Sequence, residues 1–174
     1  MNQYCAKGRR SSWLGVTLLQ TSGTDTMKGV YALIISLDKI TSIKAGSLGS
    51  MAIQDGTWVY VGSAMGNGST SLENRIRRHL TAEKAIHWHI DYLLEKASVV
   101  RALYSETQNR QECVLASAIF NSGHFALGPK GFGSSDCHSS CGSHLFLYEG
   151  SLQIEEVLLN AFRSIGLQPK NWIV

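Results

Sequence analysis

Nearly continuous apolar runs mark two segments in the first half of the chain. Residues 30–37, VYALIISL, and residues 58–61, WVYV, are rich in β-branched and aromatic side chains. Such runs are typical of strands that are covered on both faces. Some twenty residues with several glycines separate them, which favours an elaborated hairpin over a tight turn.

Amphipathic spacing predicts four helices farther along the chain. The first begins near Ser69 or Ser71, either of which could cap it, and its apolar stripe runs from Leu72 to Leu80. The other three helices are predicted over residues 86–97, residues 109–123 with Gly123 at the end, and residues 151–167 with Ser151 as the cap.

Two more strands are predicted, at residues 98–104 and 144–149, and the Gly- and Ser-rich stretch 123–143 is predicted to be a loop. Strands and helices therefore interleave along the chain. This order predicts a mixed α/β (α+β) protein with a small sheet.

Composition changes this picture little. The chain has 174 residues, of which 44% are hydrophobic, and this size favours one domain with a substantial core. The working domain is expected at residues 27–174, and residues 1–26 are interpreted as a loosely attached N-terminal extension. No apolar run approaches the roughly 20 residues that a membrane span needs. Four cysteines without a secreted-scaffold pattern favour a reduced, cytoplasmic protein.

Charge limits how the protein can contact nucleic acid. The net charge is +3, and two of those charges belong to the first 26 residues. The rest of the chain is therefore almost neutral, which argues against a protein that coats nucleic acid generally. Any recognition of phosphate must come from a local cluster of side chains.

The helix over residues 72–80 carries such a cluster. At 100° per residue, Arg75 and His79 lie together along one border of the apolar stripe. Arg77 lies on the opposite border, where it is expected to pair with Glu73, and Arg78 points furthest from the core. For Arg75, this position is equally compatible with a functional role and with simple exposure on the surface.

A second signal is Glu112, which falls on the same helix face as the apolar Leu115 and Ile119. A carboxylate that leans toward packed apolar surface needs a partner, either a cationic side chain or a divalent metal ion. Interaction with the helix dipole is the alternative. Tyr31 and Tyr60 lie centrally in two strands, a place where core aromatics are common.

Taken together, these segments resemble a known family. GVY at 29–31, YVG at 60–62, ENRIRRH at 73–79 and the later Glu112 resemble the GIY-YIG nuclease superfamily. The stretches YVGSA, RIRRHL, HWHIDYLL and GFGSSDC resemble its compact prokaryotic branch of uncharacterised proteins. Some members of that branch are joined to a DNA-repair glycosylase-type domain.

The resemblance implies a small, mainly antiparallel sheet flanked by helices, with both tyrosines side by side. It further implies a metal-dependent endonuclease that cleaves phosphodiester bonds in DNA, with a role in repair and a repair partner protein. The implied catalytic residues are Tyr31, Tyr60, Arg75 and His79.

Other expected roles follow from the same resemblance. Glu112 is expected to hold Mg²⁺ or Mn²⁺. Tyr31 is expected to act as base or base relay, if its pKa is lowered. The residues expected to contact the nucleic acid are Ser63, Gly66, Arg77 and Arg78, and the auxiliary candidates are His89 and Asp136.

Cys137, Cys141 and His144 offer a competing interpretation. Their spacing could hold Zn²⁺ if His87, His89 or Cys113 supplied a fourth ligand. A histidine on a strand fits badly into a short chelating loop, so zinc is not expected and packed thiols are favoured. A non-catalytic nucleic-acid-binding module and a zinc-organised interaction module are therefore the alternatives to a nuclease.

Overall fold

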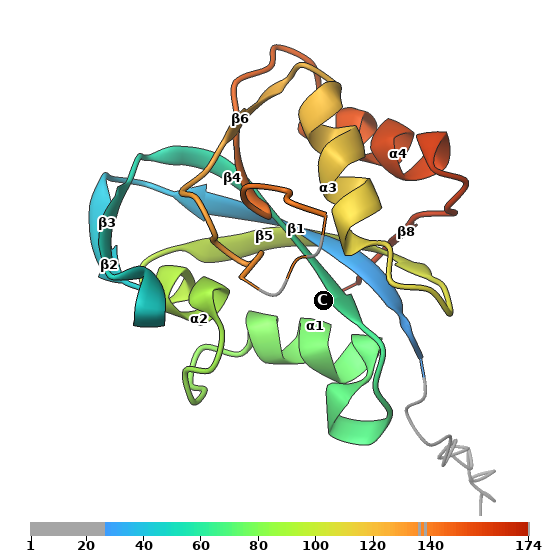
Figure 1. The fold of residues 1–174 in the computed structure, drawn as a ribbon, viewed down its shortest axis with the longest axis horizontal. Coiled ribbons are helices and arrows are strands. Elements are labelled where there is room, and N and C mark those ends of the chain that lie inside the picture. Colours follow the sequence, from blue (N-terminus) through green and yellow to red (C-terminus); the bar gives the residue numbers. More distant parts are fainter. Residues whose placement is uncertain (1–26, 136, 138, 174) are drawn as a thin grey trace, which may run out of the picture.

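The structure is a computed structural model that describes residues 27–173 apart from 136 and 138. One six-stranded sheet has the order β6-β7-β4-β1-β5-β8, and each neighbouring pair is antiparallel (Figure 1). The mixed α/β class with a small antiparallel sheet is confirmed. The strands of this sheet are β1 (Gly29–Leu37), β4 (Gly56–Ala64), β5 (Ser98–Glu106), β6 (Phe125–Leu127), β7 (Leu145–Tyr148) and β8 (Lys170–Asn171).

The long connection between β1 and β4 contains its own small sheet. Strands β2 (Thr41–Lys44) and β3 (Ser50–Ile53) pair with each other, and a 3₁₀ turn, Gly46–Leu48, joins them. The predicted elaborated hairpin is therefore correct.

Helices cover both faces of the large sheet. The helices are α1 (Leu72–Leu80), α2 (His89–Leu94), α3 (Glu112–Asn121) and α4 (Ile154–Ser164). In Figure 1, α1 and α2 lie on one side of the sheet, and α3 and α4 lie on the other.

Alternate residues of β1 supply the two cores. Leu33 packs in the cluster that contains Ile76 of α1, whereas Val30 packs in the cluster that contains Leu115 of α3. A strand covered on both faces is apolar at nearly every position, as the run VYALIISL predicted.

Helix α1 begins as predicted, because the Ser71 hydroxyl accepts a hydrogen bond from the Asn74 N–H at 3.4 Å. The prediction for residues 86–97 is too long, because α2 begins only at His89. The carboxylate of Asp91 accepts hydrogen bonds from the backbone N–H groups of His87 and Trp88, which fixes the start of the helix there.

Two other boundaries differ from the prediction. Helix α4 has Gln153 rather than Ser151 at its N-cap position, and no side chain caps it. Strand β6 lies inside the stretch that was expected to be loop. It has only three residues, too few to show a period.

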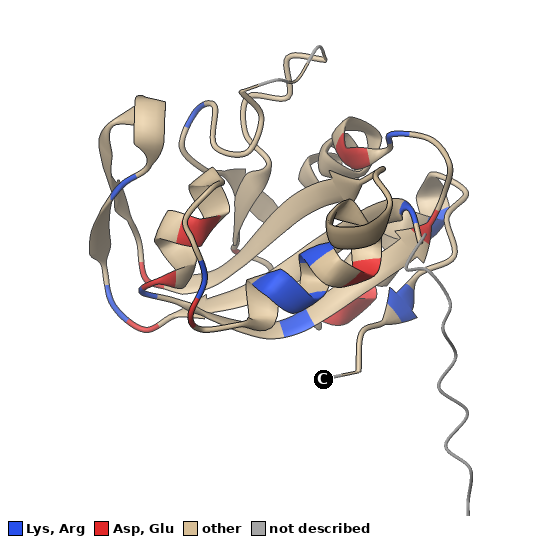
Figure 2. Ribbon diagram, turned by 90° about the horizontal axis from the view of Figure 1, so that it is seen from below, with Lys and Arg blue, Asp and Glu red and all other residues tan. Residues whose placement is uncertain are grey.

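Figure 2 shows that Lys and Arg are interspersed with Asp and Glu, and that basic residues gather on α1. None of the helices in the described part of the chain has the length and hydropathy of a membrane span. The predicted N-terminal extension, residues 1–26, lies outside the described residues.

Candidate functional site

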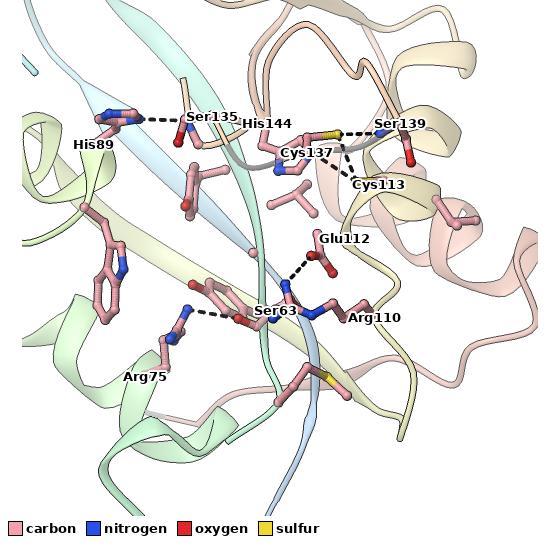
Figure 3. Close-up of a pocket in the computed structure, with 18 of the residues that line it drawn as sticks. Ser63, Arg75, His89, Arg110, Glu112, Cys113, Ser135, Cys137, Ser139 and His144 are labelled. Atoms are coloured by element: carbon pink, nitrogen blue, oxygen red, sulfur yellow. Dashed lines mark hydrogen bonds and ion pairs between the residues drawn. The ribbon is translucent and has the colours of Figure 1, made fainter. Parts of the chain in front are cut away.

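A pocket of about 790 Å³ lies beside the end of β4 (Figure 3). Strand β7 pairs with β4 as far as Tyr60, and the Val61 N–H donates one more hydrogen bond to the His144 carbonyl oxygen. Among the described residues, the part of β4 after Val61 therefore runs along an edge of the sheet. Strands β1 and β4, helix α1, the start of α3 and the loop of residues 128–144 all contribute to the lining. Four of the five residues expected to be catalytic or to hold the metal line this pocket: Tyr31, Tyr60, Arg75 and Glu112.

The strand register places the two tyrosines on the same face of the sheet. Tyr31 lies opposite Gly62, and Leu33 lies opposite Tyr60, so the two phenols are diagonal neighbours with ring centroids 6.5 Å apart. A Cβ atom at Gly62 would overlap the phenol group of Tyr31. The glycine of the YVG stretch therefore leaves the space that the Tyr31 side chain fills.

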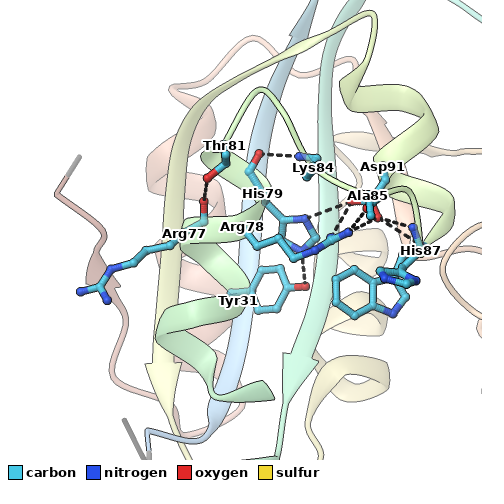
Figure 4. A network of polar contacts seen from close by, with 10 residues as sticks. Tyr31, Arg77, Arg78, His79, Thr81, Lys84, Ala85, His87 and Asp91 are labelled. Atoms are coloured by element: carbon cyan, nitrogen blue, oxygen red, sulfur yellow. Dashed lines mark hydrogen bonds and ion pairs between the residues drawn. The ribbon is translucent and has the colours of Figure 1, made fainter. Parts of the chain in front are cut away.

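Tyr31 forms the floor of the pocket and is only 1% exposed. Its hydroxyl lies 2.9 Å from His79 Nε2 (Figure 4). Burial raises the pKa of Tyr31 well above its ordinary value, Tyr60 raises it further, and Arg75 opposes the shift. The phenol is therefore neutral at physiological pH, contrary to the lowered pKa that a base would need.

His79 connects the phenol to a buried carboxylate. Burial lowers the pKa of His79 to about 3, so its imidazole is neutral. Nδ1 lies 3.8 Å from Asp91 Oδ1 and has no hydrogen-bond partner among residues 27–173, leaving aside 136 and 138. The nearby carboxylate favours the tautomer with hydrogen on Nδ1, in which Nε2 accepts the hydrogen bond from Tyr31.

The angular argument predicted that Arg78 points away from the core into solvent, and this prediction is wrong. Its guanidinium donates two hydrogen bonds, each 3.0 Å long, to the fully buried carboxylate of Asp91 (Figure 4). Burial alone would raise the pKa of Asp91. Hydrogen bonds from Arg78, Trp88 and His87 outweigh that effect and hold the pKa below its ordinary value. Arg78 is therefore a structural residue that joins α1 to the start of α2.

His87 also contacts Asp91. On a helix over residues 86–97 the two side chains would be four residues apart on one face. Because His87 precedes α2, it contacts the carboxylate through its backbone N–H instead, at 2.9 Å.

Arg75 is held at the pocket wall from two sides. Its Nη1 donates a 3.1 Å hydrogen bond to the carbonyl oxygen of Ser63, and its guanidinium carbon lies 4.4 Å from the ring centroid of Trp88. Its buried Nε has no hydrogen-bond partner within the described residues. These contacts fix the cation where an anionic ligand in the pocket would meet it.

Glu112 reaches the pocket from the opposite layer. The body of α3 packs on the other face of the sheet, but Glu112 is its first residue and lines the pocket beside the edge of β4. Its Oε1 lies 3.6 Å from Arg110 Nη1. Its Oε2 is buried and lacks a hydrogen-bond partner in the part of the chain that the structure describes. One carboxylate completed by water and phosphate oxygens is a common way to bind Mg²⁺.

Arg110 is a pocket residue that the sequence prediction missed. Its side chain is 71% exposed and lines the rim beside Glu112. A cation two residues before a carboxylate at a helix start is a weak signal. Only the geometry of the rim shows that it faces the pocket.

Some of the remaining expected site residues line the pocket, and others do not. Ser63 and Gly66 line the pocket, and Arg77 forms the predicted pair with Glu73, outside the pocket lining. His89 also lines the pocket, and its Nδ1 accepts a 3.3 Å hydrogen bond from the backbone N–H of Gly133. Asp136 lies outside the described residues.

A group of metal-ligating side chains forms another part of the wall. Donor atoms of Cys113, Cys137, Cys141 and His144 all lie within 4.8 Å of one another, so the group could hold a metal ion. The argument that His144 fits badly because it lies on a strand is wrong. His144 directly precedes β7, and its Nε2 lies 3.8 Å from Cys113 Sγ.

Comparison with known proteins identifies one family. A family model described as "Domain of unknown function DUF123" matches residues 30–167. Neither a curated protein nor a solved structure matches the chain.

Proposed function

This chain belongs to the DUF123 family, whose description states no activity, and we propose from the pocket that it is a metal-dependent nuclease. Its substrate would be DNA, and its reaction the hydrolysis of a phosphodiester bond. One observation carries the proposal: two phenols, a fixed guanidinium and a carboxylate line the same pocket, and one oxygen of that carboxylate has no hydrogen-bond partner among the described residues. The GIY-YIG resemblance of the same residues supports this assignment.

In the proposed reaction, Arg75 binds the scissile phosphate. Its contacts with Ser63 and Trp88 leave Nε inside the pocket wall without a partner among the described residues. A fixed guanidinium can hydrogen-bond non-bridging phosphate oxygens and neutralise the charge that grows in the transition state. Arg110, at the rim, would contact a neighbouring phosphate.

Glu112 is the residue suited to hold the divalent ion. A hard ion such as Mg²⁺ or Mn²⁺ would polarise the phosphate and lower the pKa of the attacking water. The buried Oε2 of Glu112 provides the protein's negative oxygen for it. Because Glu112 comes from the layer opposite the phenols, the substrate would lie across the edge of β4.

The two tyrosines are assigned orienting roles. With its pKa raised by burial, Tyr31 donates a hydrogen bond to His79 and keeps its proton. His79, with a pKa of about 3, accepts that hydrogen bond without taking up the proton. Tyr60 is 7% exposed and stands beside Tyr31, where its phenol can orient water or phosphate.

Nicking of supercoiled plasmid DNA by the purified chain, with and without added Mg²⁺ or Mn²⁺, tests the proposal. Cleavage is expected only with the added ion. Arg75→Ala should slow it on the order of 100-fold, since removing one transition-state donor has that effect. Glu112→Gln should slow it comparably because the neutral amide no longer attracts the ion.

Matched variants outside the pocket serve as controls. Arg163→Ala removes an exposed cation of α4, and Glu156→Gln removes an exposed carboxylate of the same helix. Both should cleave at the rate of the unaltered protein. Cleavage that survives Glu112→Gln unchanged would contradict the proposal.

Binding without cleavage is the second candidate function. The near-complete burial of Tyr31 and its raised pKa favour it, because a buried neutral phenol gives no general base. Salt-sensitive DNA binding that Arg75→Ala weakens, with no metal-dependent nicking, is the result expected from this alternative.

A further inference from the structure

Four soft metal ligands from two distant segments meet at one point of the pocket wall. Cys113 belongs to the first turn of α3, and Cys137, Cys141 and His144 come from the loop of residues 128–144. The chain between Cys113 and Cys137 passes through α3 and β6 before it returns. If the cysteines met only because small side chains pack well, there would be no reason for a histidine nitrogen to lie at the same point.

The distances suit a tetrahedral ion. Cys137 Sγ lies 3.2 Å from Cys113 Sγ and 3.2 Å from Cys141 Sγ. His144 Nε2 lies 3.8 Å from Cys113 Sγ. With zinc–sulfur bonds of about 2.3 Å, the edges of a tetrahedral site are about 3.8 Å long, so small outward shifts of the sulfur atoms would admit the ion. The cysteines of the described residues are free thiols.

The donor set selects the kind of metal. Three thiolates and one imidazole are soft and borderline ligands, which favour Zn²⁺ over the hard ions Mg²⁺ and Mn²⁺. Four protein ligands leave no open position for water or substrate. A closed site of this composition is structural rather than catalytic.

In the loop that supplies three of these ligands, the described residues of the central part are not buried. Phe132 is fully buried, and Ser143 and His144 are buried at the far end. Between them, no described residue from 134 to 142 is buried. Hydrophobic burial cannot fix such a segment, whereas a metal cross-link to a helix can.

The same loop forms a wall of the pocket. Gly133 lies so close to Tyr60 that an added Cβ would overlap the ring, and its N–H donates to His89 Nδ1 at 3.3 Å. On the helix side, Cys113 directly follows Glu112. A metal at the cluster would therefore join the wall beside Tyr60 to the residue next to Glu112.

We propose that Cys113, Cys137, Cys141 and His144 bind one structural Zn²⁺ that fastens the loop of residues 128–144 to the start of α3. This cross-link fixes the distance between the two walls of the pocket. The zinc site is independent of the proposed nuclease activity, because it depends only on the four ligands and their spacing.

Metal analysis of the purified full-length chain tests the proposal directly. After dialysis against metal-free buffer, elemental analysis should find about one zinc ion per chain. Replacement of zinc by Co²⁺ should give thiolate-to-cobalt charge-transfer absorption and the intense visible bands of a tetrahedral site. Cys141→Ser and His144→Asn should each lower the retained zinc at least tenfold.

Two matched variants separate this site from other thiols and from the proposed ion at Glu112. Cys5→Ser changes the chain's remaining cysteine and should leave the zinc content unchanged. Glu112→Gln should also retain full zinc content even where nicking is lost. Failure of the nuclease proposal would therefore leave this result intact.

Folding of the variants needs its own measurement. Amide hydrogen exchange should show faster exchange in the loop of residues 128–144 for Cys141→Ser, while β1 stays protected. The proposal is overturned if the unaltered chain retains less than about a tenth of an ion after loading with zinc. Zinc retained in full by both Cys141→Ser and His144→Asn would overturn it as well.

Discussion

At the scale of single residues, Gly62 decides how Tyr31 is placed. Gly62→Ala would put a methyl group where the phenol now lies, and the hydrogen bond to His79 would be lost or displaced. Overpacking of this kind costs about 1–3 kcal/mol. We expect a loss of stability in that range, measured by urea denaturation, together with impaired function of the pocket.

A double-mutant cycle provides the control for Gly62→Ala. The overlap involves the hydroxyl and the outer ring atoms of Tyr31, which a leucine side chain lacks. The cost of Gly62→Ala should therefore be smaller when measured in the Tyr31→Leu background. Equal costs in both backgrounds would show that the alanine acts on the backbone of β4 rather than on the phenol.

His79 should make the stability of the protein depend on pH. Its pKa in the folded protein is about 3, below the ordinary value near 6.5, because burial disfavours the imidazolium. As the pH falls below 6.5, the unfolded chain takes up a proton that the folded protein does not. Stability should therefore fall by about 1.4 kcal/mol per pH unit from this residue, and the loss continues until pH approaches 3.

Denaturation at several pH values between 6.5 and 5 measures this slope before most carboxylates titrate. His79→Gln should remove the contribution, whereas His124→Gln, a substitution before β6 and outside this network, should retain it. An identical pH slope for the unaltered protein and for His79→Gln would contradict the assignment.

At the scale of elements, one ion pair connects α1 to α2. Asp91 is fully buried, and Arg78 is the cation that compensates it. Removing one partner of a buried pair costs about 3–5 kcal/mol, because the remaining charge is left without compensation. The backbone N–H groups of His87 and Trp88 still contact Asp91, so we expect Arg78→Met to cost about 3 kcal/mol, measured by urea denaturation.

Arg77→Met is the matched control on the same helix. Arg77 is 57% exposed and pairs with Glu73 on the surface, and such pairs contribute only about 0–1 kcal/mol. If Arg78→Met costs no more than Arg77→Met, the buried pair is not what holds α2 against α1.

Periodicity predicted the elements that are long enough to show a period. Helix α1 buries Leu72 and Ile76 on the expected stripe, and β1 is apolar on both faces as its sequence indicates. Periodicity did not predict the short elements or their bounds. Strand β8 has two residues, and α2 is shortened because the Asp91 side chain turns back onto the preceding backbone. This capping contact is local, because it joins residues three and four positions apart, but a search for apolar periodicity does not detect it.

The residues of α1 and the cysteine cluster are two parts of the candidate site, and they were predictable from the sequence to different extents. The residues on α1 could be sorted by angle, so the pocket position of Arg75 was accessible from the sequence. The burial of Arg78 was not, because its partner belongs to a later helix. The position of Cys113 beside Cys137 depends on the path of the loop after β6, and spacing along the chain contains no information on that path.

At the scale of the whole molecule, the pocket lies between two layers that fold around different cores. Tyr31 and Tyr60 belong to the core under α1 and α2, whereas α3 packs with α4 on the other face. Only the first turn of α3 reaches around the edge of β4. Any substrate that contacts both Arg75 and Glu112 must therefore cross this edge, which limits the contact to a short stretch of nucleic acid.

The small charge of the protein leads to a last prediction, on salt dependence. The net charge is only +3, and among the described residues the Lys and Arg side chains that line the pocket are Arg75 and Arg110. Each phosphate contact contributes about −0.9 to the slope of log K against log salt, so two contacts predict a slope near −2 for duplex DNA. Fluorescence anisotropy titrations should show Arg110→Ala reducing that slope by about 0.9, while Arg163→Ala, an exposed cation of α4, leaves it unchanged. A slope of about −6 would instead require an extended basic surface, whereas Figure 2 shows Lys and Arg interspersed with Asp and Glu along the described residues.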